Sequence, residues 1–240
     1  MVSVIIPSYN HGKALRYCLD SLRVQTHQSF EVIIVDDGSS DHTDDIVHQY
    51  VRSYNEGVRM RYVRISHKGA PVARNVGARQ ARGDYLLFAD ADVVFKPHAL
   101  ARLLNALAEN LKAAYAYSDF RFGWKKFYGR PFDANALKTN NFIHTTSLIR
   151  RARFSGFDET LARFQDWDLW LTMLEHGDTG IYVPEELFVV SITRPGISTW
   201  RPRFWYFLCS LFDHTIGIAP IAYHHYIAAR TIVARKHGLT

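Results

Sequence analysis

Cysteine is scarce in this sequence. Its 240 residues include two cysteines, Cys18 and Cys209. This number is too small for the disulfide framework of a small secreted domain or for a zinc site built from cysteines. Both cysteines lie in apolar, helix-like stretches, so we expect them to be small buried side chains rather than reactive thiols.

Long hydrophobic runs are also missing. No stretch approaches the ~20 consecutive apolar residues that a membrane-spanning helix needs. The first residues contain no basic cluster, and their apolar run, Val2–Ile6, is too short for the hydrophobic region of a signal peptide. No G-x-S-x-G nucleophile motif occurs, and the histidines show no metal-ligand spacing. These absences predict a cytoplasmic protein without a serine nucleophile.

The composition is that of a globular protein with a moderate positive charge. Hydrophobic residues make up 48% of the chain, and 29 Lys and Arg against 23 Asp and Glu give a net charge of +6. The only tight basic clusters are Lys125-Lys126, Arg150-Arg151 and Arg235-Lys236-His237. A nucleic-acid-binding surface normally concentrates its charge in a stripe or a recognisable motif. We therefore expect no nucleic-acid partner.

The first 120 residues alternate short β-type runs with helical patterns. The expected strands are Val2–Ile6, Glu31–Val35, Met60–Ile65 and Tyr85–Ala89. Their nearly continuous hydrophobicity is typical of parallel strands that are buried on both faces. Apolar residues at helical spacing occupy the intervals and continue over about 97–111. This order predicts an α/β fold with a doubly wound, mostly parallel central sheet and helices on both faces.

The pattern changes after Tyr117. Residues 118–141 favour a long loop with some strand, and Phe142–Ile149 is a further strand candidate. Asp166–Glu175 has the spacing of an amphipathic helix. From Arg201 onward the sequence is rich in aromatic residues, which predicts a C-terminal helical extension.

Acidic residues follow two of the expected strands. Asp36 and Asp37 come after the second strand, and Asp90 and Asp92 come after the fourth. The carboxyl ends of parallel strands meet at one edge of a sheet, so these carboxylates are expected to converge. Side chains two positions apart on a strand point to the same side, and a divalent cation would relieve the repulsion between Asp90 and Asp92.

Each of these residues also has a purely structural explanation. Asp36 and Asp37 are compatible with an Asx-turn before a helix cap, as well as with an acceptor for the N–H of a nucleotide base. Arg74, near the start of a helix, suits either a phosphate or an Asp partner. Asp166 stands in the first turn of its helix, where the helix dipole alone favours a carboxylate.

Five segments taken together resemble glycosyltransferase family 2, the inverting enzymes of the GT-A fold. They are Val2–Asn10, Val35–Asp41, Ala73–Gly77, Gly83–Asp92 and Asp166–Trp170. The resemblance covers residues 1–200 and implies a GT-A domain with a nucleotide-sugar-binding half (1–118) and an acceptor half (119–200). Residues 201–240 then form the C-terminal extension.

The resemblance also implies roles for individual residues. The nucleotide-binding residues would be Pro7, Tyr9, Asp36, Asp37, Arg74 and Asp90. Asp92, together with Asp90, would hold Mg²⁺ or Mn²⁺, and Asp166 matches the general base. The implied partners are a UDP-, GDP- or dTDP-sugar donor and a glycan or lipid-linked acceptor.

Two positions depart from the family pattern. Gln165 replaces the Glu that usually precedes the base, so the like-charge repulsion that would raise the pKa of Asp166 is missing. Arg194 stands where a His often precedes Pro-Gly. A cation there suits the donor diphosphate, but it makes a third metal ligand doubtful.

Two other functions fit parts of the sequence. The segment Asp90–Val94 matches the D-x-D-x-V motif of haloacid-dehalogenase-like phosphatases, although that motif normally follows the first strand of those enzymes. Gln165 would also fit a catalytically inactive protein that binds a nucleotide sugar or acts as a scaffold. The basic and aromatic segment Arg201–Leu208 suits either a packed helix or peripheral contact at the inner face of a membrane.

Overall fold

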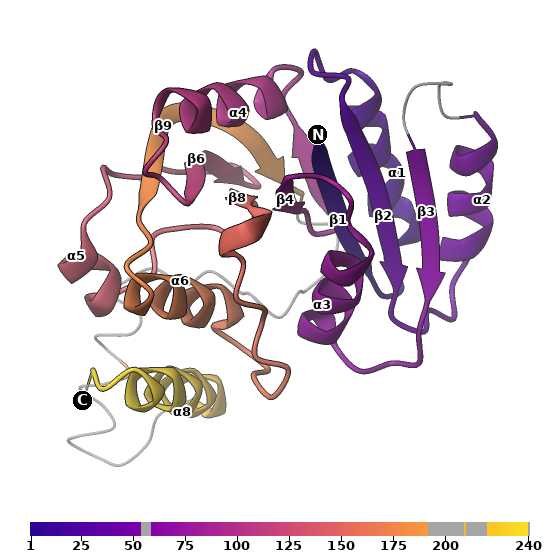
Figure 1. Cartoon of the computed structure of the whole chain (residues 1–240). Helices are drawn as coiled ribbons and strands as arrows, with labels where there is room; N and C mark the ends of the chain where they lie inside the picture. Colours follow the sequence, from indigo (N-terminus) through magenta and orange to yellow (C-terminus); the bar gives the residue numbers. More distant parts are fainter. Residues whose placement is uncertain (54–58, 192–208, 210–219, 240) are drawn as a thin grey trace.

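The computed structural model describes residues 1–53, 59–191, 209 and 220–239 (Figure 1). Arg194 and the aromatic run that begins at Arg201 lie outside the described residues. Within the described ranges, no helix is both long enough and apolar enough to cross a bilayer.

One sheet organises the described part of the chain. Its strands are β1 (Val2–Ser8), β2 (Phe30–Asp36), β3 (Arg59–Arg64), β4 (Tyr85–Phe88), β5 (Val93–Phe95), β6 (Tyr115–Phe122), β7 (Lys125–Phe127), β8 (Leu148–Arg150) and β9 (Gly180–Val190). Their order across the sheet is β3-β2-β1-β4-β8-β6-β9-β5, with β7 paired to β6. The helices are α1 (Gly12–Arg23), α2 (Thr43–Ser53), α3 (Ala70–Gln80), α4 (Ala99–Glu109), α5 (Ala134–Thr139), α6 (Gln165–Glu175) and α8 (Ile221–Lys236).

The first four strands form the parallel half of the sheet. β1 pairs in parallel with β2 and β4, and β2 pairs in parallel with β3. Both β1 and β2 are buried along their whole length, as their continuous apolar sequences predict. Beyond β4 the sheet is mixed, because β8 runs antiparallel to β4 and β6, whereas β6 and β9 are parallel.

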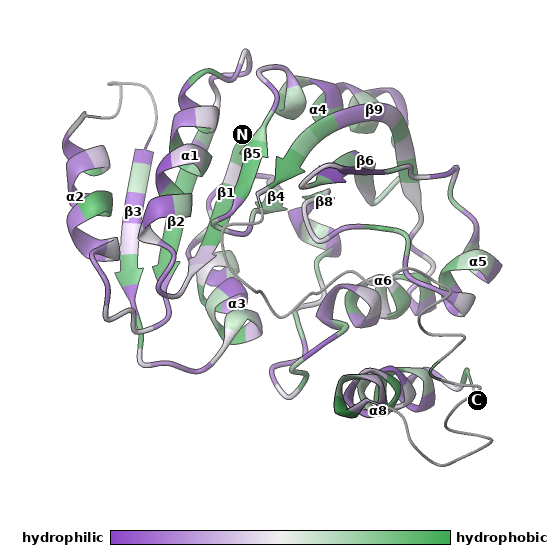
Figure 2. Ribbon diagram, turned by 180° about the vertical axis from the view of Figure 1, so that it is seen from behind, coloured by the Kyte–Doolittle hydropathy of each residue, from purple (hydrophilic) through white to green (hydrophobic). Residues whose placement is uncertain are grey.

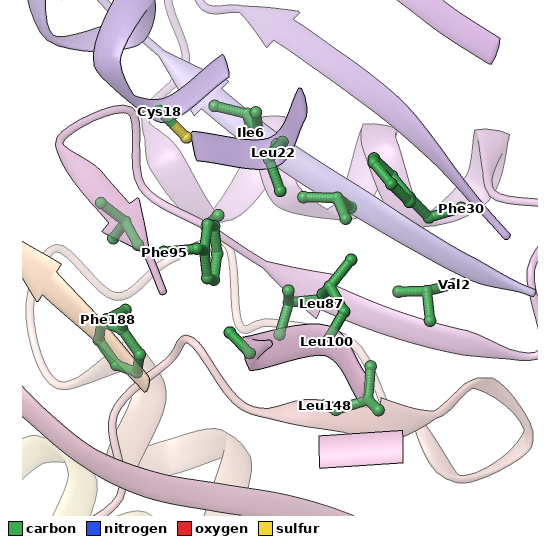
Figure 3. Packing of buried hydrophobic residues seen from close by; sticks show 14 of the residues in the cluster. Val2, Ile6, Cys18, Leu22, Phe30, Leu87, Phe95, Leu100, Leu148 and Phe188 are labelled. Carbon is green, nitrogen blue, oxygen red and sulfur yellow. The ribbon is translucent and has the colours of Figure 1, made fainter. Parts of the chain in front are cut away.

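Helices cover both faces of the sheet, and each face has its own hydrophobic core. Val4 and Ile6 of β1 pack with α1 and α4 on one face. Ile5, which points the other way, belongs to the second core, to which α3, α6 and α8 also contribute residues. The alternating sides of successive strand residues explain this division. Figure 3 shows Cys18 and Leu22 within the first core, and Figure 2 shows the apolar strands that separate the two layers. Cys18 and Cys209 are buried, free thiols.

The second half of the sheet departs from the sequence-based expectations. The expected loop over 118–141 contains most of β6, all of β7 and α5. Of the expected strand Phe142–Ile149, only the last two residues lie in a strand, which is β8 (Leu148–Arg150). The reason is local: His144 accepts a hydrogen bond from the Thr146 amide (3.0 Å), and the Ser147 hydroxyl donates to the His144 carbonyl (2.7 Å). Such side-chain and backbone bonds form a turn instead of a strand.

The C-terminal helix α8 packs against α6, and both views show the two helices lying together (Figures 1 and 2). Its anchor is Asp168, a buried residue of α6. The Asp168 carboxylate lies 2.8 Å from Lys236 Nζ and 2.9 Å from His237 Nε2. The His237 ring is 2% exposed, and its Nδ1 lies 2.7 Å from a Glu175 carboxylate oxygen. The C-terminal end of α8 is therefore joined to α6 by polar contacts centred on the buried Asp168 carboxylate and the buried His237 ring.

Removing one member of this network should destabilise the protein. His237→Ala removes one of the two side chains that contact the buried Asp168 carboxylate and opens a cavity, so we expect the free energy of unfolding to fall by about 3 kcal/mol. Urea denaturation measures this change. His225→Ala, on the exposed face of the same helix, should change the stability by less than about 0.5 kcal/mol. Equal stabilities for the two variants would contradict the anchoring role of His237.

Candidate functional site

The carboxyl ends of β1, β2 and β4 form one edge of the sheet. In the parallel register, Ser8 at the end of β1 lies opposite Asp36 at the end of β2. The Asp37 amide donates to the Ser8 carbonyl (2.8 Å), and the Ala89 amide donates to the Ile5 carbonyl (2.9 Å). The segments that follow these three strands therefore leave the sheet at the same edge, as the sequence predicts.

Asp36 lies beneath this edge and is fully buried. One of its carboxylate oxygens accepts from the Ser39 amide (2.9 Å), and the other accepts from the Tyr62 hydroxyl (2.7 Å). Burial, followed by this bond to Asp36, raises the pKa of Tyr62. The next helix, α2, begins after Asp41, which accepts from the Thr43 amide (3.1 Å). This is the turn and helix cap that the structural explanation predicts.

Asp37 closes the loop that enters α3. Its two carboxylate oxygens accept from the amides of Lys68 (2.7 Å) and Gly69 (2.8 Å). The Asp37 carboxylate also lies 2.9 Å from Nδ1 of His67. The Tyr9 ring stacks on His67 with 4.0 Å between the ring centroids and is 42% exposed. This arrangement places an exposed aromatic face directly beside Asp37.

The remaining nucleotide-site candidate on β1, Pro7, is buried within the strand. Its neighbour across the sheet is Val35. Tyr9, which follows β1, therefore exposes its ring, whereas Pro7 is buried in the strand and is not exposed to a ligand.

Asp90 and Asp92 lie in the turn between β4 and β5, which the Val93 amide closes by donating to the Asp90 carbonyl (3.0 Å). Burial alone would raise the pKa of Asp90, but the charge and hydrogen bond of Arg74 outweigh it and hold this pKa below its usual range. Burial and the nearby charge of Asp90 raise the pKa of Asp92 to about 7. Two carboxyl groups in one turn thus differ in their affinity for a proton.

Arg74 connects this turn to α6. Its side chain projects from α3, and the residue is 6% exposed. Nη2 donates to Asp90 (2.6 Å), and Nη1 donates to the side-chain carbonyl of Gln165 (2.6 Å). Its Nε is buried and has no hydrogen-bond partner among the described residues. The sequence suggests either a phosphate or an Asp as the partner of Arg74, and in the structure Arg74 binds Asp90.

Asp166 follows Gln165 in the first turn of α6. One carboxylate oxygen accepts from the Asn141 side-chain amide (2.7 Å), and the other accepts from the Trp167 backbone amide (2.9 Å). Burial raises the pKa of Asp166 above its usual value, although these two hydrogen bonds and the charge of Arg74 act against the rise. The carboxylate is thus oriented by two donors, and it follows directly on Gln165, which Arg74 joins to Asp90.

Sequence reasoning missed two polar residues at this site. Asn141 orients Asp166, and the His144 ring contacts the stacked rings of Phe120 and Phe188, at centroid distances of 4.6 and 5.1 Å. Burial lowers the pKa of His144 to about 4, so the ring is neutral at pH 7. Asn141 directly precedes the expected strand Phe142–Ile149, and His144 lies within it. Neither residue belongs to a motif that would have marked it in the sequence.

The Asp90 and Asp92 pair fits one mode of cation binding. The described residues contain no group of three or more His, Cys, Asp or Glu side chains that could enclose a metal ion. Mg²⁺, however, is usually held by one or two carboxylates together with substrate phosphates, and not by a cage made of protein alone. Two carboxyl groups in one turn, where burial and the charge of Asp90 raise the pKa of Asp92, are compatible with that mode.

Comparison with known proteins identifies the family. The family described as Glycosyl transferase family 2 matches residues 3–164, well over half of the chain. A Bacillus subtilis protein named for teichuronic acid biosynthesis, TuaG, is 30% identical over 215 residues, which is 84% of this chain and 83% of TuaG. The chain spans only 62% of an uncharacterised Haemophilus influenzae glycosyltransferase (30% identical over 73% of this chain) and 27% of an Escherichia coli chondroitin synthase (29% identical over 74%).

Solved structures support the same fold. The first 349 residues of Staphylococcus aureus TarS, in complex with UDP-GlcNAc, superimpose with a TM-score of 0.70 at 20% identity, covering 93% of this chain and 68% of that one. A Pyrobaculum calidifontis mannosyltransferase, in complex with GDP-Man and Mn²⁺, gives a TM-score of 0.67 at 22% identity, covering 97% and 69%. The chain that carries these acidic residues therefore belongs to glycosyl transferase family 2 and has the GT-A fold.

Proposed function

We propose that this protein transfers a sugar from a nucleotide-diphospho-sugar to an acceptor hydroxyl, with inversion at the anomeric carbon and with Asp166 as the general base. The observation that carries the proposal is the Arg74 bridge between Asp90 and Gln165, the residue directly before Asp166. Ligands of α/β proteins bind at this edge. Membership of a glycosyltransferase family supports the same reaction over the phosphatase alternative.

The chemistry assigned to Asp166 is proton removal. As the acceptor oxygen attacks C1 of the donor sugar, its proton passes to the Asp166 carboxylate, and the bond between C1 and the diphosphate oxygen breaks. Asn141 and the Trp167 amide fix the direction of the carboxylate. Its raised pKa strengthens it as a base, while the charge of Arg74 limits that rise.

The donor side of the proposal rests on Tyr9, Asp37 and the turn with Asp90 and Asp92. The exposed Tyr9 ring offers a stacking surface for a base, and Asp37 lies beside it. We assign Mg²⁺ or Mn²⁺ to Asp92, with Asp90 as the second carboxylate. When bound, such an ion neutralises the charge that develops on the departing diphosphate. The UDP-GlcNAc and GDP-Man complexes of TarS and the mannosyltransferase make UDP- and GDP-sugars the first donors to assay.

Peripheral membrane contact through residues 201–240 remains part of the proposal. The described helix of this segment, α8, has basic residues and no acidic one. Its Ile221 and Ile232 side chains are exposed. Such a surface suits an anionic bilayer and a lipid-linked acceptor at the inner face of the membrane.

Binding to vesicles tests this contact. The protein should sediment with vesicles that contain phosphatidylglycerol, and the double variant Ile221→Ser/Ile232→Ser should sediment severalfold less. Leu111→Ser, which replaces an exposed apolar residue after α4, is the matched control. Equal sedimentation of all three proteins would remove α8 from the proposal.

Replacing the base tests the reaction itself. Asp166→Asn keeps the shape of the side chain but cannot take a proton, so turnover should fall by about 10²–10⁴-fold. Affinity for the nucleoside diphosphate should stay within about twofold, because the loss falls on the transition state. The assay measures nucleoside diphosphate release, and calorimetry measures binding. Asp45→Asn, on the exposed surface of α2, is the control. Normal turnover of Asp166→Asn would refute the base, and binding without any turnover in the wild-type protein would support the inactive alternative.

The raised pKa of Asp92 predicts a cost in stability. Its pKa is about 7 in the folded protein and about 3.9 in an unfolded chain. Between these values the folded state holds the proton more tightly, so its stability falls as the pH rises from about 4 to 7. Asp92→Asn removes this loss. In EDTA, the variant should therefore gain about 1–4 kcal/mol over the wild type by pH 8 and almost nothing at pH 4. Urea denaturation across this pH range measures the gain, and a difference that is constant with pH would show that Asp92 titrates normally.

A further inference from the structure

The guanidinium of Arg74 is held in place by Gln165. The Gln165 side-chain nitrogen donates to the Leu161 carbonyl (2.9 Å), which fixes the orientation of the amide. Its oxygen therefore faces Arg74 and accepts from Nη1 at 2.6 Å. The second arm of the guanidinium reaches Asp90. Arg74 thus has two strong hydrogen bonds, one to a carboxylate and one to a neutral amide.

Of the two hydrogen-bond partners of Arg74, only Asp90 carries a negative charge that offsets the positive charge of the guanidinium. Asp90 is its one carboxylate partner among the described residues. On the side of α6, the amide of Gln165 satisfies a hydrogen bond but contributes no negative charge. The guanidinium is almost completely buried, and charges act more strongly on each other where water is excluded.

Asp166 is the titratable group that stands next to this cation on α6. The charged group acting on it among the described residues is Arg74 from α3. The other contacts come from neutral donors, the Asn141 side chain and the Trp167 backbone. Asp168, two residues further along α6, pairs with Lys236 and His237 of the C-terminal segment.

We propose that Gln165 is a positioning residue that holds the Arg74 guanidinium between Asp90 and the first turn of α6 without neutralising it, so that its positive charge remains available to the Asp166 carboxylate. A carboxylate at position 165 would make the same hydrogen bond but would share the charge of Arg74 and repel Asp166. The amide therefore keeps Asp166 ionised to a lower pH than a Glu at this position would. The catalytic part of this inference rests on the proposed function of Asp166, whereas the electrostatic part does not.

Two substitutions separate the hydrogen bond from the charge. Gln165→Glu retains an acceptor for Arg74 and adds a negative charge, so the pKa of Asp166 should rise by about one unit or more. Gln165→Met removes the acceptor without adding charge and should shift this pKa by much less. Arg79→Gln, on an exposed position in the last turn of α3, removes a cation from the same helix and should leave the pKa of Asp166 unchanged.

The measurement is direct and needs no substrate. Aspartate carboxyl carbons labelled with ¹³C are titrated by NMR in the full chain, and the Asp166 signal is the one lost in Asp166→Asn. Arg74→Gln serves as the second test in case Gln165→Glu fails to fold, as judged by circular dichroism. It removes the cation and should also raise the pKa of Asp166.

The outcomes distinguish this inference from the proposed function. An unchanged pKa of Asp166 in Gln165→Glu, or in Arg74→Gln where the first variant is unfolded, would overturn the inference. If the pKa rises as expected, the acid limb of kcat for the active UDP- or GDP-sugar should move to higher pH by the same amount, with the donor KM within about twofold. A raised pKa together with normal turnover of Asp166→Asn would confirm the electrostatic role of Gln165 and refute the base.

Discussion

The burial of one cation, Arg74, connects the two halves of this molecule. Helix α3 projects its guanidinium between the turn after β4 and the first turn of α6, where it donates to Asp90 and Gln165. A buried charge is tolerated only where it is paired and hydrogen-bonded. The position of Arg74 therefore depends on Asp90, and the position of α6 relative to the sheet edge depends on both. Reacting groups must be held in a precise relative geometry, and a bridge of this kind fixes Asp90 and the first turn of α6 relative to each other.

The opposite side of α6 has its own electrostatic support. Asp168 is buried against Lys236 and His237. The first turn of α6 is thus held from the sheet by Arg74 through Gln165, and from the C-terminal segment through Asp168. Asp166 lies between these two attachments. Residues 220–239 are therefore an integral part of the described fold, because their removal would leave the buried Asp168 carboxylate without Lys236 and His237.

The parallel half of the sheet could be predicted because its sequence is simple. Strands such as β1 and β2 are buried on both faces and are mostly apolar, and the segments that follow parallel strands leave the sheet at one edge. The strands β6 and β9 do not follow this pattern. Asp119 of β6 is buried and is satisfied by the Gly129 amide and the Tyr182 hydroxyl, and β9 contains Pro184. A buried polar residue and a proline both interrupt the signal of a strand.

The same distinction applies to the site. Asp90, Asp92 and Asp166 could be named from motifs, but the partners that set their pKa values come from distant segments. Asn141 and His144 belong to no recognised pattern, because their contacts exist only after the segment before β8 has packed against α6 and the end of the sheet. Sequence patterns can therefore predict which carboxylates follow the parallel strands at the carboxyl edge, whereas the basicity of these carboxylates is a property of tertiary packing.

A crystal structure with Mn²⁺ and the nucleotide sugar that the protein turns over would test the central claim most directly. The account predicts an anomalous manganese peak between the diphosphate and Asp92, with the sugar C1 facing Asp166 and with Arg74 still bound to Asp90 and Gln165. A diphosphate seated on Arg74, with its bridge to Gln165 broken, or a donor bound away from Asp92 and Asp166, would contradict it.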